Sequence, residues 1–147
     1  MTTNNQTDKL ELAYTIFCDD VRLEVGNKLS LMGVFHQIMV QQFPVSVMKF
    51  AVVHQWRGEG AHLSEVRILS QDRQQPIVLS QPTPFEIAPG GVANNISFFF
   101  NVVFHAPGQY WVQTLVNSSL HDEQALTILA ADASGPAAPE AASDAIN

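Results

Sequence analysis

The chain has 147 residues, a length typical of one domain that can bury a sizeable core. It holds 14 acidic and 7 basic side chains, and this formal charge of -7 makes nucleic acid and an anionic membrane surface unexpected partners. A single cysteine excludes a disulfide within the chain. The sequence has no basic start followed by an apolar run, and no stretch of about 18 apolar residues, so we expect a cytoplasmic protein.

Residues 1–9 are polar, and we expect a flexible N-terminus there. From Leu10 onward, apolar residues recur with a period of two, which is the pattern of a half-buried strand. β-branched and aromatic residues dominate these runs, and Gly, Pro, Asn, Asp and Ser separate them. In chain order the runs are LELAYTIFC, VRLEV, KLSLMGVFHQI, VMKFAVVHQW, HLSEVRIL, PIVLS, NNISFFFNVVFH, QYWVQTLV and QALTILAA.

This pattern predicts an all-β fold over residues 10–131, an immunoglobulin-like antiparallel β-sandwich of about eight strands. Residues 132–147 consist mainly of Ala, Pro, Ser and acidic side chains and have almost nothing to bury. Because such a composition cannot offset the entropy of ordering, we predict a disordered C-terminal tail.

The first hairpin of the predicted sandwich constrains its own turn. Opposed residues of an antiparallel pair share a face, so Leu23 and Val25 must lie on the same face as Leu29 and Leu31. Opposing Val25 to Leu29 and Leu23 to Leu31 leaves an odd loop centred on Asn27. We therefore expect a turn of three or five residues rather than two.

A second turn follows the run that ends at His105. Pro107 and Gly108 reverse the chain, and Tyr110 opens the next strand. In immunoglobulin-like sandwiches a tyrosine at this kind of corner bonds back to nearby backbone, and we expect that role for Tyr110 rather than a catalytic one.

Three segments carry a resemblance to a known family: IFCDDVRLEVGNKLSLMGVF, WRGEGAHLSEVRILSQDRQQPI and HAPGQYWVQTLVN. They resemble an uncharacterised family of short bacterial hypothetical proteins with a predicted sandwich domain. The resemblance covers residues 10–131 and leaves out the tail. It implies the sandwich fold, and it implies no activity and no functional residue.

The only cysteine is followed directly by two aspartates. Cys18 shares its strand parity with Tyr14 and Ile16, so we expect a core thiol, with Asp19 outward and Asp20 at a bend. A Cys–His nucleophile or an aspartate metal site is the functional alternative.

The five histidines are scattered without metal-ligand spacing, and no phosphate-binding or nucleophile-elbow motif occurs. We therefore assign no catalytic residue, no cofactor and no metal ligand. The stretch WRGEGAH predicts a loop tip with Arg57, Glu59 and His62 as a candidate binding loop. Trp56 beside it is expected in the core, with the wall of a binding groove as the alternative.

The aromatic run SFFFNVVFH predicts an interface. Simple alternation places Phe98, Phe100, Val102 and Phe104 in the core and leaves Phe99 and Val103 facing outward. On the next strand, alternation likewise leaves Trp111 and Leu115 outward. The candidate interface residues are therefore Phe99, Val103, Trp111 and Leu115, because large apolar groups on an outer face suggest cover by another chain.

The leading functional hypothesis is a non-enzymatic cytoplasmic binding or assembly module that meets a protein partner, or a second copy of itself, through an apolar sheet face or its loops. A small-ligand or carbohydrate-binding sandwich that uses Trp56 and Trp111 is the alternative. A second alternative is a small Cys- or metal-dependent hydrolase that uses Cys18, Asp19 and Asp20 with a distant histidine.

Overall fold

The computed structural model describes residues 10–131, which form eight β-strands and no helix. Among these residues there is accordingly no helix long and apolar enough to cross a membrane. The strands are β1 (Leu10–Glu24), β2 (Lys28–Phe35), β3 (Gln37–Val40), β4 (Val45–Leu69), β5 (Pro76–Leu79), β6 (Thr83–Phe104), β7 (Gly108–Val116) and β8 (Ser119–Ala130). The predicted all-β fold is confirmed. The predicted flexible N-terminus (1–9) and disordered tail (132–147) lie outside the described residues.

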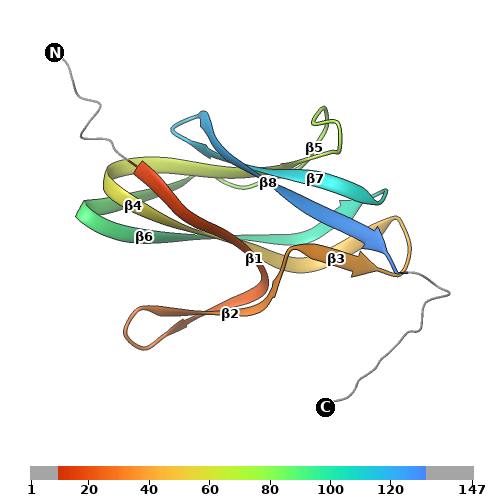
Figure 1. Ribbon diagram of the computed structural model, residues 1–147, viewed down its shortest axis with the longest axis horizontal. Coiled ribbons are helices and arrows are strands. Elements are labelled where there is room, and N and C mark those ends of the chain that lie inside the picture. Colours follow the sequence, from red (N-terminus) through yellow and green to blue (C-terminus); the bar gives the residue numbers. More distant parts are fainter. Residues whose placement is uncertain (1–9, 132–147) are drawn as a thin grey trace.

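The strands belong to one sheet with the order β2-β1-β4-β7-β8-β3, and β5 and β6 also pair with β4. All ladders are antiparallel except that between β3 and β8, which is parallel, so the sheet is mixed. Figure 1 shows this sheet curled so that its strands form two facing layers. Of the predicted immunoglobulin-like antiparallel sandwich of about eight strands, the eight strands are confirmed, but they form one curled sheet with a parallel pair, because long strands run continuously from one layer into the other.

Strand β4 is the central strand of the sheet because it pairs with β1, β5, β6 and β7. It bends where its register with β6 shifts, between Gly58 and Gly60. Both glycines have positive φ, a conformation that glycine adopts at little cost, so the strand turns without losing its partner. The predicted loop at Arg57–His62 is therefore a bend inside β4 rather than a connection between two strands.

The curled sheet is closed on one side and open on the other. Only His36 separates β2 from β3, and β2 pairs with β1 whereas β3 pairs with β8, so this nearly continuous stretch joins the two layers. On the opposite side, β5 and β6 each pair with β4, but no ladder joins β5 to β6 within residues 10–131. The open side of the sheet therefore lies between β5 and β6.

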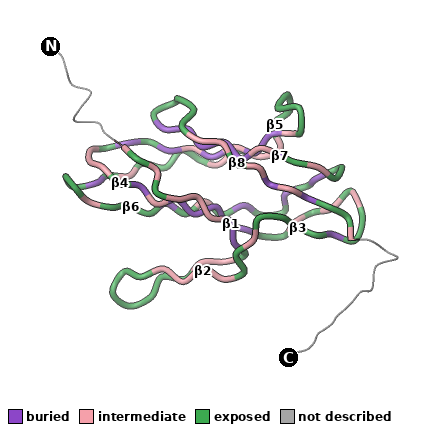
Figure 2. Tube along the Cα trace, viewed as in Figure 1, coloured by how far each residue is buried: buried purple, intermediate pink, exposed green. Residues whose placement is uncertain are grey.

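The main core fills the space between the layers, and Figure 2 shows buried residues along both of them. Its members are Phe17, Val40, Phe50, Val52, Val66, Ile68, Phe99, Val102, Phe104, Tyr110, Val112, Leu126 and Ile128. Tyr110 packs edge-on against Phe104, and its hydroxyl donates a 2.6 Å hydrogen bond to the carbonyl of Ala106. The predicted tyrosine corner is thus confirmed.

The β1–β2 hairpin has a turn of three residues, Val25 to Asn27, as predicted. The pairing differs by two residues from the predicted one, since Leu23 opposes Leu29, but a shift of two leaves every side chain on its expected face. Positive φ angles at Gly26 and Asn27 allow this turn.

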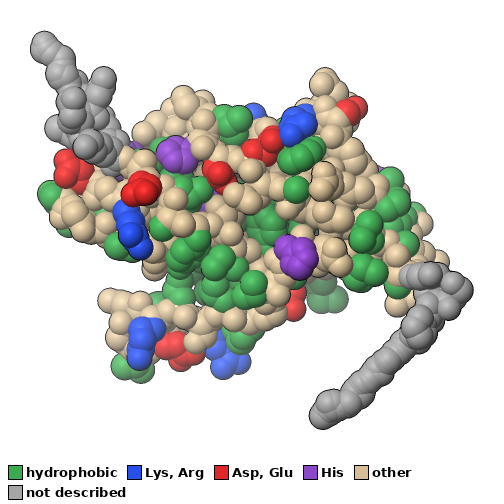
Figure 3. Space-filling model, viewed as in Figure 1, with side chains coloured by type: hydrophobic (Ala, Val, Ile, Leu, Met, Phe, Trp, Pro, Cys, Tyr) green, Lys and Arg blue, Asp and Glu red, His purple; other side chains and the backbone are tan. Residues whose placement is uncertain are grey.

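The β1–β2 hairpin projects from the rest of the sheet (Figure 1), and Figure 3 shows hydrophobic side chains between it and the body of the molecule. A second small core lies there on the outer face of β4, made of Cys18, Ala51 and Val53. Val21, Leu29 and Leu31 of the hairpin pack against it. Beside this cluster, the continuation of the same outer face onto β6 is exposed.

Candidate functional site

The alternation of side chains along β6 changes at Asn101, and this corrects the predicted interface. Phe99 is buried at 3% exposure, whereas Phe98 and Phe100 are 39% and 60% exposed. Beyond Asn101, Val102 is buried and Val103 is 42% exposed, as predicted. The outward orientation predicted for Phe99 is therefore wrong.

The cause of the change is an irregularity that both paired strands share. Asn101 has a φ of 54°, a left-handed conformation that asparagine tolerates better than most residues. Its counterpart on β4 is Met48, which is exposed together with the neighbouring Lys49. One extra outward residue on each strand shifts the alternation by one. An asparagine inside the apolar run FFFNVVF is the sequence signal that could have revealed it.

Four exposed side chains, Ile96, Phe98, Phe100 and Val103, form what we call the β6 outer face. The rings of Phe98 and Phe100 stack with their centroids 6.3 Å apart. No Asp, Glu, Lys or Arg occurs anywhere in residues 87–121, so β6 presents these groups in a stretch without charge from residue 87 onward. Contiguous exposed apolar groups of this kind are typical of a binding surface.

The open side of the sheet is hollowed along the β6 outer face. Two hollows lie between β5 and β6, and Val78 and Phe100 line both of them. We call them together the β5–β6 groove. Its walls are apolar side chains and uncharged polar ones such as Ser80 and Gln81, and no Asp, Glu, Lys or Arg lines it. The groove is thus suited to an uncharged, partly apolar segment.

One ion pair borders the β6 outer face. Lys49 pairs with Phe100 across the ladder, and its Nζ lies 5.1 Å from the centre of the Phe98 ring and 2.9 Å from Oδ1 of Asp20. The hydrogen bond from Lys49 and a second from the backbone amide of Val21 lower the pKa of Asp20. Asp20 therefore bonds local backbone, as expected, and offsets the charge nearest to the apolar face.

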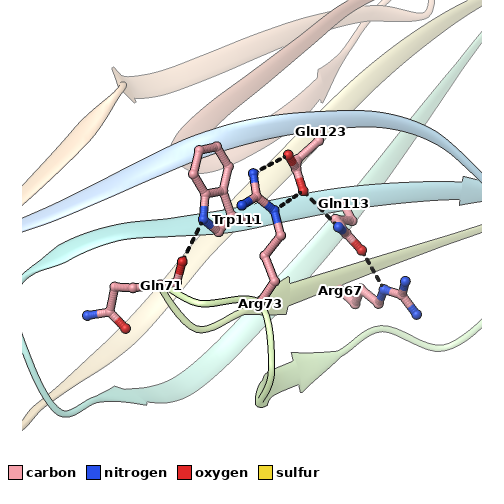
Figure 4. A network of polar contacts seen from close by, with 6 residues as sticks. All are labelled: Arg67, Gln71, Arg73, Trp111, Gln113 and Glu123. Carbon is pink, nitrogen blue, oxygen red and sulfur yellow. Dashed lines mark hydrogen bonds and ion pairs between the residues drawn. The ribbon is translucent and has the colours of Figure 1, made fainter.

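The predicted interface residue Trp111 lies on a different surface, which side chains of this chain cover. The Arg73 guanidinium carbon lies 3.9 Å from the centre of the Trp111 ring, and the indole Nε1 donates a 3.1 Å hydrogen bond to the carbonyl of Gln71 (Figure 4). Leu115, which pairs with Glu65, is only 9% exposed. Neither residue adds to the β6 outer face.

The same surface holds a polar network on β4, β7 and β8. Arg73 donates two hydrogen bonds, of 2.9 and 2.7 Å, to the carboxylate of Glu123 (Figure 4). Gln113 donates to Glu123 at 2.7 Å and accepts a bond from Arg67 at 2.8 Å. The bonds from Arg73, followed by that from Gln113, lower the pKa of Glu123 to about 2. The charged and polar groups of this network are hydrogen-bonded to one another, so they are not free to form a binding site on this surface.

The candidate loop residues do not converge on a site. Arg57 is exposed, whereas His62 is buried. The Nε2 atom of His62 donates a 2.8 Å hydrogen bond to the backbone carbonyl of Glu59. The Nδ1 atom of His62 lies 3.3 Å from Nδ2, the side-chain amide nitrogen, of Asn117. His62 therefore holds the bend of β4 against the turn that follows β7.

Cys18 is fully buried in the small core described above, which confirms its predicted place. Burial, and then the nearby charge of Asp19, raises the pKa of its thiol. Asp19 itself is exposed, as expected. Within residues 10–131 no group of three or more His, Cys, Asp and Glu side chains is arranged to hold a metal ion.

Trp56 and His54 are also inside. Trp56 is fully buried, as expected, and stacks between His54 and Phe85. His54 Nε2 lies 2.8 Å from the hydroxyl of Thr114, and burial lowers the pKa of this histidine to about 4. Both residues stabilise the interior, and neither reaches the surface.

These features define an all-β protein with a curled mixed sheet, open along an uncharged groove and an apolar outer face. The sequence model of a family described as "Family of unknown function (DUF6941)" matches residues 13–129. The chain therefore belongs to this family, and the resemblance to an uncharacterised family is confirmed. No curated protein sequence matches the chain.

Two solved structures share the fold over most of this chain. One is the Pseudomonas fluorescens alkylpurine DNA glycosylase AlkC bound to DNA containing an abasic site analog, with a TM-score of 0.53 and 8% identity. The other is the β-glucosidase from Listeria innocua in complex with isofagomine, with a TM-score of 0.50 and 10% identity. Each match covers 82% of this chain, but only 30% of the glycosylase chain and 16% of the glucosidase chain. At this identity the likeness concerns the fold alone.

Proposed function

We propose that this protein is a non-enzymatic cytoplasmic binding or assembly module that holds a protein partner on the β6 outer face and in the β5–β6 groove. The observation that carries the proposal is the exposure of Phe98 and Phe100 side by side in a long stretch of chain without charge. Aromatic side chains in such a position contribute more to protein interfaces than most residues do.

The chemistry of the groove supports a protein partner over other classes. An extended peptide segment adds to a free sheet edge through its backbone and places alternate side chains in the adjoining hollows. Nucleic acid is held mainly by Lys and Arg, and neither lines the groove, while the chain carries a charge of -7. We therefore do not extend DNA binding from the glycosylase to this chain.

The two alternative functions lack a supporting observation. A carbohydrate site that uses Trp56 and Trp111 needs exposed rings, but Trp56 is fully buried and the Arg73 guanidinium lies over the Trp111 ring. A hydrolase that uses Cys18 needs an accessible thiolate, and Cys18 is buried with a raised pKa. For the fold, we propose that the curled sheet is a variant of the immunoglobulin-like sandwich, which the hydrogen bond at the Tyr110 corner supports.

The test is a capture experiment with the full chain and one matched control. Tagged wild type, Phe100→Asp and Val34→Asp are each mixed with an extract of cells that naturally produce this protein, and the bound proteins are quantified by mass spectrometry. Val34 on the β1–β2 hairpin is 61% exposed, almost the same as Phe100 at 60%, so both variants place a charge at equally exposed apolar positions.

We expect wild type and Val34→Asp to retain a common partner that Phe100→Asp loses by about tenfold or more, since a tenfold loss needs only about 1.4 kcal/mol. Retention of the same proteins by wild type and Phe100→Asp would exclude the β6 outer face as the binding surface. Circular dichroism of all three chains shows that each is folded before the comparison is made.

A further inference from the structure

We infer that the partner on the β6 outer face is a second copy of this chain, with the two β6 strands paired antiparallel across a two-fold axis near Phe98. This inference rests on the proposed function, because it names the occupant of the same surface.

The edge of β6 that faces the groove is open to pairing. From residue 91 to Phe104 the strand pairs with β4 along one edge, and within residues 10–131 no other strand pairs with it. Proteins protect such edges with lysine, proline or other charged groups that discourage strand addition. This stretch contains no proline and no charged residue, so the irregularity at Asn101 is the one feature described above that interrupts the edge.

The lack of charge along this edge favours an uncharged surface, such as that of a second copy, over a charged partner. Two copies with a charge of -7 each repel one another wherever acidic surfaces meet. A two-fold contact between β6 strands brings together residues without charge, and Lys49 beside them is already bonded to Asp20. A strongly acidic or basic partner would gain nothing from such a surface, whereas an identical surface meets it without repulsion.

Self-pairing also matches the pattern of side chains. Opposed residues of an antiparallel ladder share a face, so a pairing centred on Phe98 places Phe98 opposite itself. The same register places Ile96 of each copy opposite Phe100 of the other. Both residues belong to the β6 outer face, so the apolar groups of the two copies meet on one continuous surface. The contact is isologous and closes with two copies.

The area indicates a weak dimer. A buried aromatic side chain covers roughly 150–250 Å², and the exposed parts of Phe98 and Phe100 therefore amount to about 200 Å² per copy. A standard interface takes about 800 Å² from each partner, so the backbone pairing and the groove must supply the remainder. We expect a dimer that forms at high protein concentration and dissociates on dilution.

The test is the mass of the full chain in solution, measured by light scattering over a dilution series from about 500 to about 1 micromolar, which brackets affinities around the micromolar range. The wild type should approach twice its chain mass of 16.2 kDa at the highest concentration and return toward 16.2 kDa on dilution. Phe100→Asp should stay at the monomer mass throughout. Val34→Asp, the matched control, should follow the wild type.

A second measurement checks the register and does not depend on a charged variant. In Phe98→Cys, the two new thiols lie next to each other at the axis, so a short bismaleimide should link most of the chains into dimers. Wild type should remain unlinked because its own Cys18 is fully buried, and Val34→Cys, away from the axis, should link far less.

A wild-type chain that is monomeric at every concentration would overturn the inference, as would a Phe100→Asp chain that dimerises like wild type. Equal linking of Phe98→Cys and Val34→Cys would overturn the proposed register. If wild type is monomeric but the capture experiment shows a partner that Phe100→Asp loses, the second copy is excluded while the proposed function stands. If the capture experiment also shows no difference between wild type and Phe100→Asp, both the inferred dimer and the proposed function are contradicted.

Discussion

Cys18 is the residue whose chemistry depends most on where it lies. Its thiol is fully buried against Ala51 and Val53 beneath the β1–β2 hairpin, and burial raises its pKa. A maleimide reagent should therefore label Cys18 slowly in the native chain and within the mixing time in denaturant. Rapid labelling of the native chain, with a thiolate pKa well below about 8.5, would contradict the buried position and return attention to a nucleophilic role.

His54 is a buried base whose pKa, lowered by burial from 6.5 to about 4, links stability to pH. The unfolded chain takes up this proton first as pH falls, so the contribution to stability is complete above about pH 6.5 and is lost between about pH 6.5 and 4. The charges of Asp122 and His121 act in opposite directions, since Asp122 raises the pKa of His54 and His121 lowers it. Burial remains the largest cause of the lowered pKa of His54.

We therefore expect the unfolding free energy to fall by about 2 kcal/mol between pH 7 and pH 5 because of His54. His54→Gln keeps a group that can bond Thr114 and removes the titration, so its stability should change much less over this range. Glu123 is distinguishable, because its pKa is lowered from 4.5 to about 2 and its contribution is lost only between those two values. Equal slopes for wild type and His54→Gln in urea unfolding would contradict the assignment.

At the scale of elements, the β1–β2 hairpin depends on one glycine. Gly33 has a φ of 68°, and a Cβ atom built there would collide with the carboxylate of Asp19. Gly90, in β6, has a similar φ of 74° but open space around it. An alanine at either position introduces backbone strain that lowers the unfolding free energy by about 1 kcal/mol. Only the alanine at position 33 also clashes with another side chain, that of Asp19.

Gly33→Ala should thus lower the unfolding free energy more than Gly90→Ala does, and adding Asp19→Ala to the Gly33→Ala chain should recover part of the difference. Thermal melting of the four chains checks this. Equal losses at the two glycines would show that the Asp19 side chain moves aside freely.

Strand β6 offers the sharpest test of an element. Phe99 is buried, so Phe99→Asp leaves an unpaired charge in the core and should cost several kcal/mol of unfolding free energy, enough to unfold a marginally stable domain. Phe100→Asp replaces an exposed side chain and should change the stability by less than about 0.5 kcal/mol. Circular dichroism of the two chains at equal concentration decides. An unfolded Phe100→Asp beside a folded Phe99→Asp would restore simple alternation along the strand.

The strands themselves could be predicted from the sequence because a period of two is a local property. The tyrosine corner, the buried Cys18 and the length of the first turn follow from equally local rules. The orientation of Phe99 could not be predicted by alternation, because one left-handed residue, Asn101, shifts the alternation of the residues before it relative to those after it. The covered position of Trp111 could not be predicted either, because the Arg73 side chain that covers it comes from the connection between β4 and β5, which is distant from Trp111 in the sequence.

At the scale of the molecule, the pairing of distant strands determines where a site can form. No local pattern predicts that β3 pairs parallel to β8, or that β4 and β6 bend together and continue from one layer of the sheet to the other. These non-local pairings close one side of the curled sheet and, within the part of the chain that the structure describes, leave β5 and β6 unpaired with each other across the other side. The β5–β6 groove is a consequence of topology, whereas the lack of charge along it can be read from the sequence.

We propose above that the free edge and the outer face of β6 form an interface. Hydrogen–deuterium exchange of the backbone amides in residues 96–103 tests it most directly, with wild type and Phe100→Asp compared at high protein concentration. We expect the edge amides of wild type to exchange slowly and to become fast in Phe100→Asp, while the amides of β7 stay protected in both chains. Equally fast exchange of the β6 edge in both chains would mean that nothing binds there and would contradict the claim.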